Sequence, residues 1–278
     1  MIRVSAFADE ISSDLDEQLD ALDKAGIHFL ELRSVWDTNV LDLDDGQVIE
    51  VKQALDAYGV RVAAIGSPLG KVAIDLPIEE DLSRLDRAIE LAGALQTSYI
   101  RIFSYYPPGG AGSRIDPATY RHEALARLRE MARRVSPAGL TLLHENDADL
   151  YGDTIERCVD VLRSVDSPHL QAVLDPANFI LCGQQPYPHG YRALRPWIKH
   201  VHVKDASAAH EVVPAGKGEG LWKDLLKNLR QDGYDGFFSL EPHLGAAGRF
   251  RGFSGPEAFA HAHAALEGLL DAMGWEHE

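Results

Sequence analysis

The sequence predicts an α/β fold, a (β/α)8 barrel (TIM barrel) that forms a single domain over residues 1–278. Short apolar runs alternate with helical patterns along the whole chain, which is typical of consecutive βα units and a parallel sheet. Eight such units in 278 residues match the size of this barrel. The first run is followed by ADEISSD, which lacks the glycine-rich phosphate loop that a doubly wound sheet usually carries at this point.

Each expected strand is a run of four to seven mostly apolar residues, as in sheets that are covered by helices on their outer face. No linker or low-complexity stretch separates the runs, so one domain is expected rather than two. The eight runs are residues 2–7, 29–33, 61–66, 99–104, 140–145, 170–175, 198–203 and 236–241.

Helical patterns follow the strands, with apolar positions recurring every three or four residues and charged residues on the opposite face. The clearest are residues 14–25, 79–94 and 116–135. Three glycines stand where a left-handed residue would end a helix: Gly26, Gly59 and Gly139. The segment after the sixth strand holds three prolines, so its helix should be short, about residues 189–195.

Composition limits the possible partners. The 43 acidic and 27 basic residues give a formal net charge of −16, which disfavours nucleic acid and anionic membrane surfaces. The two cysteines form no motif, the N-terminal residues do not resemble a signal peptide, and no run is long enough for a membrane span. We therefore expect a cytoplasmic protein that acts on a small molecule and could form a homo-oligomer.

Each of the last four expected strands ends with a side chain that can bind a metal ion. Glu145, Asp175, His202 and Glu241 close the fifth, sixth, seventh and eighth expected strands. Burying an ionisable group is costly unless its charge is shared, and the carboxyl ends of barrel strands meet at one face. Taken singly, Asp175 and Glu241 could instead start turns before prolines, and His202 could be an ordinary core histidine. Taken together, the four predict one shared metal centre.

The chemistry of this set favours a hard divalent metal. Three carboxylates and one imidazole suit Mn²⁺ or Mg²⁺ and could accept Co²⁺ or Zn²⁺. Glu145 and Glu241 would face each other across a substrate, where one carboxylate can remove a proton next to a carbonyl and the other can return it. This is the chemistry of an isomerase or epimerase. It also serves a lyase, if the enediolate expels a β-hydroxyl group.

Several segments carry a resemblance to a known family. HENDADLYGDT (144–154), LDPANF (174–179), HVHVKDA (200–206), VPAGKGEGLW (213–222) and LEPH (240–243) together resemble the sugar phosphate isomerase/epimerase family of xylose-isomerase-like TIM barrels, over nearly the whole chain.

The resemblance implies one divalent metal, Mn²⁺ before the other ions, held at Glu145, Asp175, His202 and Glu241, with the two glutamates as the acid/base pair. Ketose 3-epimerases of this superfamily carry a substrate-contacting histidine three residues after the strand-six aspartate. This chain has Asn178 there. An amide can still bind a sugar hydroxyl, but the departure points away from an ordinary ketose epimerase.

Other polar residues are candidates for substrate binding. Glu31 and Arg33 end the second strand on one face, and Arg101 lies within the fourth; they could orient substrate hydroxyls or metal-binding carboxylates, or pair with each other. Lys204 follows His202 on the same strand face. Arg249, in the last loop, could bind a substrate phosphate. The AGKGEG glycines should form a flexible lip of the barrel rather than a phosphate cradle.

The expected function is therefore a metal-dependent isomerase or epimerase of a ketose, keto-polyol or sugar phosphate that works through a cis-enediolate. A lyase or dehydratase acting on a keto-sugar or inosose is the alternative in the same enzyme class. An apurinic-site endonuclease shares the barrel but needs about three zincs and a basic face. A non-catalytic sugar-binding protein is the remaining alternative.

Overall fold

The structure is a computed structural model that describes residues 2–244 and 254–278. Eight parallel strands form a closed barrel in the order β1-β12-β9-β8-β7-β6-β5-β2. Each coincides with a predicted run, so the (β/α)8 prediction is confirmed. The barrel strands are β1 (Arg3–Ala6), β2 (Phe29–Leu32), β5 (Arg61–Ile65), β6 (Tyr99–Ile102), β7 (Thr141–Glu145), β8 (Leu170–Leu174), β9 (Ile198–Val203) and β12 (Phe237–Leu240).

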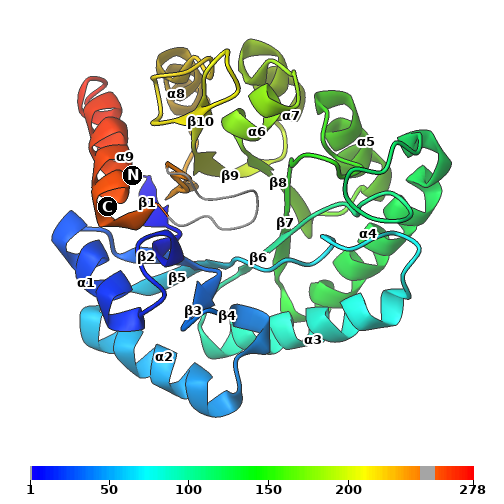
Figure 1. Cartoon of the computed structure of the whole chain (residues 1–278), viewed down its shortest axis with the longest axis horizontal. Coiled ribbons are helices and arrows are strands. Elements are labelled where there is room, and N and C mark those ends of the chain that lie inside the picture. The colour runs from blue at the N-terminus through cyan, green and yellow to red at the C-terminus, as the bar shows by residue number, and fades with distance from the viewer. Residues whose placement is uncertain (1, 245–253) are drawn as a thin grey trace.

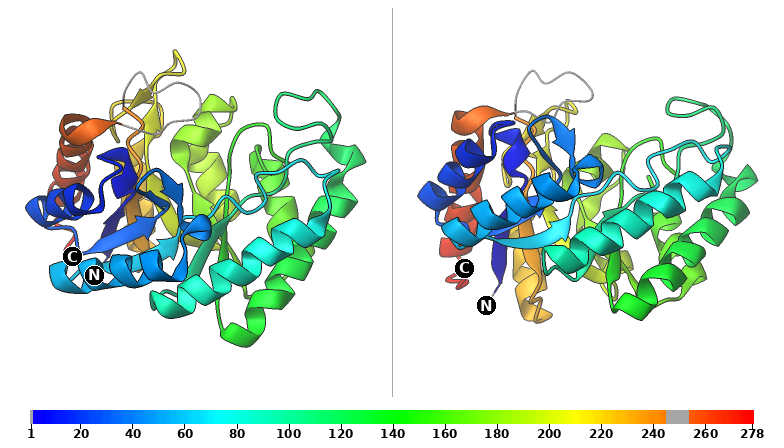
Figure 2. Two further views of the ribbon diagram at one scale, coloured as in Figure 1. Left: turned by 60° about the horizontal axis from the view of Figure 1, so that its bottom comes forward. Right: turned by 90° about the horizontal axis from the view of Figure 1, so that it is seen from below.

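Helices surround the strands in chain order (Figure 1). The two side views in Figure 2 show that they cover the outside of the barrel. They are α1 (Leu15–Ala25), α2 (Asp45–Tyr58), α3 (Ile78–Ala94), α4 (Arg121–Val135), α5 (Ile155–Val165), α6 (Pro176–Leu181), α7 (Tyr191–Leu194), α8 (Trp222–Gln231) and α9 (Gly255–Asp271). The first and last described residues lie side by side, because the Glu278 N–H donates to the Ile2 carbonyl at 3.1 Å.

The helix ends follow the residues that the sequence offers. Helix α1 begins after Asp14, whose side chain accepts the Glu17 N–H at 3.0 Å and so satisfies a free donor of the first turn. Gly26 and Gly59 end α1 and α2 in the left-handed region, at φ 69° and 67°. Gly139 has φ 68° after the short 3-10 turn that continues α4. All three predicted glycine caps are confirmed.

Two local features go beyond the predictions. The short helix expected at about 189–195 is present as α7 (Tyr191–Leu194), and a kinked π-type turn over Pro186–Gly190, where prolines remove backbone donors, leads into it. Two hairpins, β3 with β4 and β10 with β11, were not predicted, since their strands are only two residues long and carry no periodicity. Their bounds are Ser34–Val35, Thr38–Asn39, Asp205–Ala206 and Val212–Val213. No helix among the described residues has the length and hydropathy needed to cross a membrane.

The barrel interior changes from apolar to ionisable along its axis. Near the start of the strands, Phe29 and Phe237 pack with their ring centroids 5.1 Å apart. Leu143 and Val173 form a second apolar cluster. Because every second residue of a strand points inward, the positions beyond these clusters bring polar side chains to the carboxyl ends of the strands. The apolar layers form the floor of the site.

Candidate metal centre and active site

The structure brings together the four side chains that the sequence singled out. Glu145, Asp175, His202 and Glu241 are all buried, and each offers one ligand atom within 4.8 Å of the others. His202 Nδ1 lies 3.1 Å from Glu145 Oε1, 3.4 Å from Glu241 Oε2 and 3.9 Å from Asp175 Oδ2. One nitrogen therefore faces three carboxylates, a donor set suited to a divalent cation.

Asp175 divides its two oxygens between structure and site. Its Oδ1 caps α6 by accepting the Asn178 N–H at 2.9 Å. Its Oδ2 turns toward His202 and lies 3.0 Å from Lys204 Nζ. Asp175 therefore caps the following helix with one oxygen and contributes the other oxygen to the cluster.

Buried oxygens in this cluster lack hydrogen-bond partners. Glu145 Oε2 and Asp175 Oδ2 are shielded from solvent and accept no hydrogen bond among the residues that the structure describes, although Arg101 and Lys204 lie within ion-pair distance of them. Buried polar atoms are normally satisfied, so each such oxygen needs an explanation. Oxygens that converge on one imidazole nitrogen have the chemistry of a metal site, and the residues therefore fit a divalent ion.

Cations surround the two glutamates. Arg101 Nη1 lies 3.3 Å from Glu145 Oε2 and 4.0 Å from Glu241 Oε1. Lys204 Nζ lies 3.0 Å from Glu241 Oε2, and Arg33 Nη1 lies 3.2 Å from Glu241 Oε1. Arg33 and Arg101 therefore contact the glutamates rather than forming an ion pair between β2 and β6 with Glu31.

These contacts keep the glutamates ionised. Burial alone would raise the pKa of Glu145, but the neighbouring charges, His202 foremost, outweigh it and lower the pKa to about 2. Burial is also outweighed at Glu241, where Lys204 holds the pKa well below its usual range. At Asp175 burial prevails over Lys204 and raises the pKa to about 6. Both glutamates can therefore accept a proton at neutral pH.

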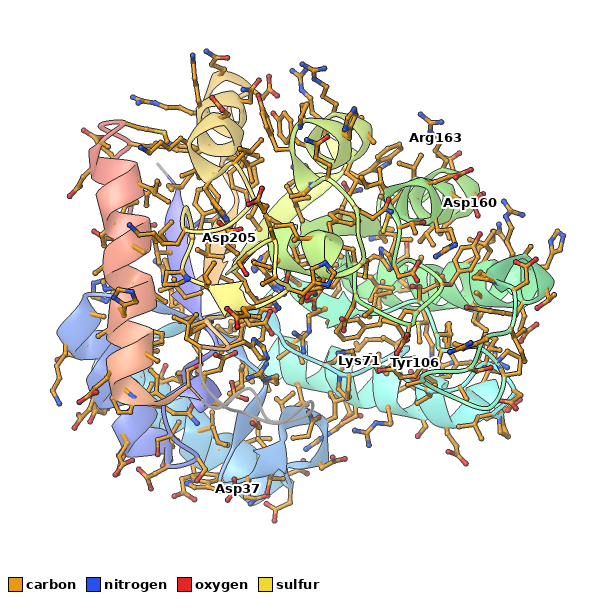
Figure 3. The ribbon with its side chains drawn as sticks, turned by 45° about the horizontal axis from the view of Figure 1, so that its top comes forward. Asp37, Lys71, Tyr106, Asp160, Arg163 and Asp205 are labelled. Atoms are coloured by element: carbon orange, nitrogen blue, oxygen red, sulfur yellow. The ribbon has the colours of Figure 1, made fainter. Side chains whose placement is uncertain are left out.

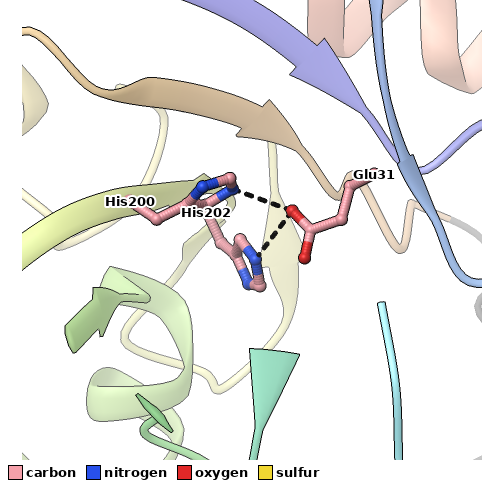
Figure 4. Close-up of side chains that lie close together, drawn as sticks. All are labelled: Glu31, His200 and His202. Atoms are coloured by element: carbon pink, nitrogen blue, oxygen red, sulfur yellow. Dashed lines mark ion pairs between the residues drawn. The ribbon is translucent and has the colours of Figure 1, made fainter. Parts of the chain in front are cut away.

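A second polar group lies directly beside the cluster. Glu31, His200 and His202 are fully buried, and Figure 4 shows both rings directed toward the Glu31 carboxylate. Glu31 Oε2 lies 2.8 Å from His200 Nε2 and 3.4 Å from His202 Nε2. The sequence predicts Glu31 as a substrate-binding candidate; in the structure its side chain lies against the two histidines, away from solvent.

The family follows from comparison with known proteins. A family model described as a xylose isomerase-like TIM barrel matches residues 19–268. The chain belongs to this family. The resemblance inferred from the sequence motifs is confirmed at that level.

Relatives within the xylose isomerase-like family differ in their chemistry. A 3-dehydroshikimate dehydratase from Bacillus anthracis is 27% identical over 138 residues, which are 50% of this chain and 48% of that protein. The match thus spans about half the length of this curated relative.

Solved structures agree with the fold over nearly the whole chain. The IOLI protein, solved with a bound zinc atom, has a TM-score of 0.77 at 16% identity and covers 98% of this chain and 99% of its own. D-psicose 3-epimerase from Clostridium cellulolyticum H10, solved with D-tagatose, has a TM-score of 0.75 at 17% identity, with 96% and 98% covered. At these identities the likeness establishes the shared fold.

Asn178 lies against Glu145. Its amide nitrogen donates to Glu145 Oε1 at 3.3 Å and to the Asn146 carbonyl at 3.0 Å. Asn178 is 8% exposed, so little of the amide is free for a substrate hydroxyl. Arg249 lies outside the described residues.

Asp9 and Glu10, which follow β1, contact residues of the site but are not among the candidates that the sequence predicts. Asp9 Oδ2 accepts from Arg33 Nε at 2.6 Å, and Glu10 Oε1 lies 3.0 Å from His243 Nδ1. Both acids lie in the 3-10 turn Ala8–Glu10, which begins two residues after β1 ends. The signal was therefore present in ADE (8–10), but these residues were used only to exclude a phosphate loop.

The backbone of the AGKGEG loop (215–220) binds the side-chain carboxylate of Asp205. Asp205 is fully buried, and its Oδ2 accepts the N–H groups of Gly216 and Gly218 at 3.1 and 2.9 Å. Its Oδ1 accepts those of Ala206 and Gly220 at 2.8 and 2.9 Å. Figure 3 labels Asp205 in this region. The expected lip is therefore organised around one carboxylate.

Proposed function

We propose that the protein is a metal-dependent isomerase or epimerase of a ketose, keto-polyol or sugar phosphate. One observation carries this function most directly: Glu145 and Glu241, from strands separated by β8 and β9, direct ionised carboxylates into one buried cluster with Asp175 and His202. The similarity to D-psicose 3-epimerase and the family membership support an enzyme that acts on a sugar-like small molecule.

Glu145, Asp175, His202 and Glu241 would hold the metal. The oxygen-rich donor set favours Mn²⁺, and the zinc in the IOLI protein is compatible with a divalent ion in a fold of this kind. When bound, such an ion polarises a substrate carbonyl and stabilises negative charge on the enediolate oxygens.

The proton transfer is assigned to the chain's own carboxylates. One glutamate removes the proton from the carbon next to the carbonyl, giving a cis-enediolate. The other, which starts as a carboxylate, takes a proton from solvent and delivers it to the adjacent carbon or to the opposite face. Arg101 contacts both glutamates and would keep them as carboxylates between turnovers. Lys204 lies beside Glu241 and would donate to a substrate oxygen, as would Arg101. The Asn178 amide donates to Glu145 and would orient that carboxylate.

A dehydratase is the second candidate, and one observation favours it. The curated relative at 27% identity is a 3-dehydroshikimate dehydratase. Dehydration needs the same first proton removal, after which the β-hydroxyl group leaves as water. Asn178, in place of the epimerases' histidine, is consistent with either reaction.

Solvent exchange tests the acid/base roles. Wild-type protein with Mn²⁺ is incubated in D₂O with a panel of keto-sugars and 3-dehydroshikimate, and products are read by mass and NMR. We expect deuterium at carbon with no loss of water from the product, and Glu145→Gln or Glu241→Gln should reduce exchange by about 10²- to 10⁴-fold. Loss of water from the product would instead establish the dehydratase.

The matched control is Asp81→Asn, which neutralises another buried carboxylate. Asp81 bonds the Tyr105 hydroxyl at 2.9 Å and is not part of the cluster. This variant should retain full exchange. Undiminished exchange in both glutamine variants would refute the acid/base assignment, and about three metals per chain would favour the endonuclease alternative.

A further inference from the structure

The Glu31 carboxylate joins two histidines of one strand. His200 and His202 are two residues apart on β9, so both rings point into the barrel. Their Nε2 atoms lie 2.8 and 3.4 Å from the same oxygen, Glu31 Oε2 (Figure 4). All three residues are 0% exposed, so water does not compete for these contacts. The carboxylate therefore acts on the His202 ring directly.

The orientation of His202 separates its two nitrogens. Nδ1 faces Glu145, Asp175 and Glu241, whereas Nε2 faces Glu31. The rings of Phe7 and His202 pack edge to face, with centroids 5.2 Å apart and planes at 84°. This contact further fixes the orientation of the His202 ring. A nitrogen of a neutral imidazole can offer its lone pair to a metal only when the ring proton is on the second nitrogen. A carboxylate beside Nε2 favours the proton there.

His200 holds the carboxylate in place. Its Nε2 contact of 2.8 Å is the shorter of the two, and its ring lies 5.8 Å from that of Phe237 in the apolar floor. A second cation between Glu31 and the two histidines would need its ligand atoms about 3 Å or more apart around a metal at roughly 2.0–2.2 Å. The 2.8 Å separation is shorter than that and is typical of an ion pair.

We propose that Glu31 is a positioning residue that holds His202 in the tautomer with Nε2 protonated, so that Nδ1 is presented to a metal in the Glu145–Asp175–Glu241 cluster. The role rests on the metal site of the proposed function. It assigns Glu31 to metal affinity rather than to substrate contact. Carboxylate partners of ligating histidines typically change metal affinity by 10- to 100-fold.

Metal binding to Glu31→Gln tests this role without any substrate. Glutamine keeps the size of the side chain but removes the charge, and its amide group can donate toward Nε2. Calorimetric titration with Mn²⁺ and Co²⁺ should give a Kd roughly 10- to 100-fold weaker than in the wild type. The visible spectrum of the Co²⁺ protein should also shift, because the ligand field of His202 changes. Asp81→Asn, another buried carboxylate, should bind both ions as the wild type does.

Each outcome separates this role from the proposed function. Absence of binding in the wild type would overturn both. Binding in Glu31→Gln with unchanged Kd and Co²⁺ spectrum would overturn only the role of Glu31. Two metals per wild-type chain, reduced to one in Glu31→Gln, would overturn it in favour of a second cation site.

A measurement on the wild type covers the case in which Glu31→Gln does not fold. In the Zn²⁺-loaded protein, ¹⁵N NMR of the histidine rings should show His202 protonated at Nε2 and coordinated through Nδ1. A ring coordinated through Nε2, or protonated at Nδ1, would overturn the assignment.

Discussion

Neighbouring residues of β7 have opposite environments. Glu145 points into the polar cluster, whereas His144 lies on the other face of the strand, against Gly152. His144 is 2% exposed and its Nε2 has no hydrogen-bond partner among the described residues. Burial lowers the pKa of His144 from 6.5 to about 4, against the opposing effect of Glu145. The ring is therefore neutral in the folded protein at pH 7.

This histidine should make stability depend on pH. The folded pKa lies below the unfolded value, so the unfolded chain takes up a proton first as the pH falls. His144 therefore favours folding above pH 6.5, and this contribution is lost between pH 6.5 and about 4, at a cost of about 3 kcal/mol. His144→Gln does not titrate and should lose less stability over that interval. Urea unfolding at pH 7.5 and 4.5 measures the difference.

Acidic side chains titrate in the wild type and in His144→Gln alike. The quantity to compare is therefore the change in the free energy of unfolding between the two pH values, and not its value at one pH. Parallel stability curves for the wild type and His144→Gln would contradict the buried neutral state of His144.

Among the elements, the loop between β11 and α8 depends most on glycine. A Cβ atom at Gly218 would lie 2.2 Å from the Ala206 carbonyl oxygen, so a side chain cannot be accommodated without moving backbone. The close approach lets the loop amides reach both oxygens of Asp205. Asp205 in turn begins β10, directly after the strand that carries His202. The loop is therefore tied to the site end of β9.

Asp205→Asn should loosen this loop. Each carboxylate oxygen accepts two backbone N–H groups, and an asparagine can replace only one of the oxygens as an acceptor. Two buried donors would then face an NH₂ group, which should lower the free energy of unfolding by about 3 kcal/mol. Hydrogen exchange of the Gly216 and Gly218 amides should accelerate together. The exposed Glu219→Gln in the same loop is the control, and equal effects of the two substitutions would refute the role of Asp205.

The strands and four site residues could be predicted because one rule covers them. Apolar runs mark strands that are buried on both faces, and an ionisable residue at the end of such a run must share its charge. The same rule would have selected Asp9 and Glu10. The partners of Glu31 could not be predicted, because contacts between β2 and β9 depend on the strand order and register of the closed barrel. The Asp205 contacts depend on loop backbone geometry, which the glycine spacing alone does not determine.

Across the whole molecule, acidic charge accumulates at the centre of the barrel as well as on its surface. The chain carries a formal charge of −16, and the cluster places Glu145, Asp175 and Glu241 around one imidazole. Lys204 and Arg101 offset part of this charge. A divalent cation would offset more of it, and it would do so only in the folded chain, because the four ligands come from distant parts of the sequence. Metal binding should therefore stabilise the entire barrel.

Thermal unfolding with and without metal tests this coupling. Mn²⁺ at about 100 times its Kd should add about 2.7 kcal/mol to the free energy of unfolding, which corresponds to a rise in Tm of roughly 5–10 °C, and a chelator should reverse it. Asp175→Asn should lose most of the rise, since the amide keeps the acceptor that caps α6 but removes a charged ligand. Asp81→Asn should retain it, because its carboxylate lies outside the cluster. An equal metal-induced rise in Asp175→Asn would place the stabilising ion elsewhere.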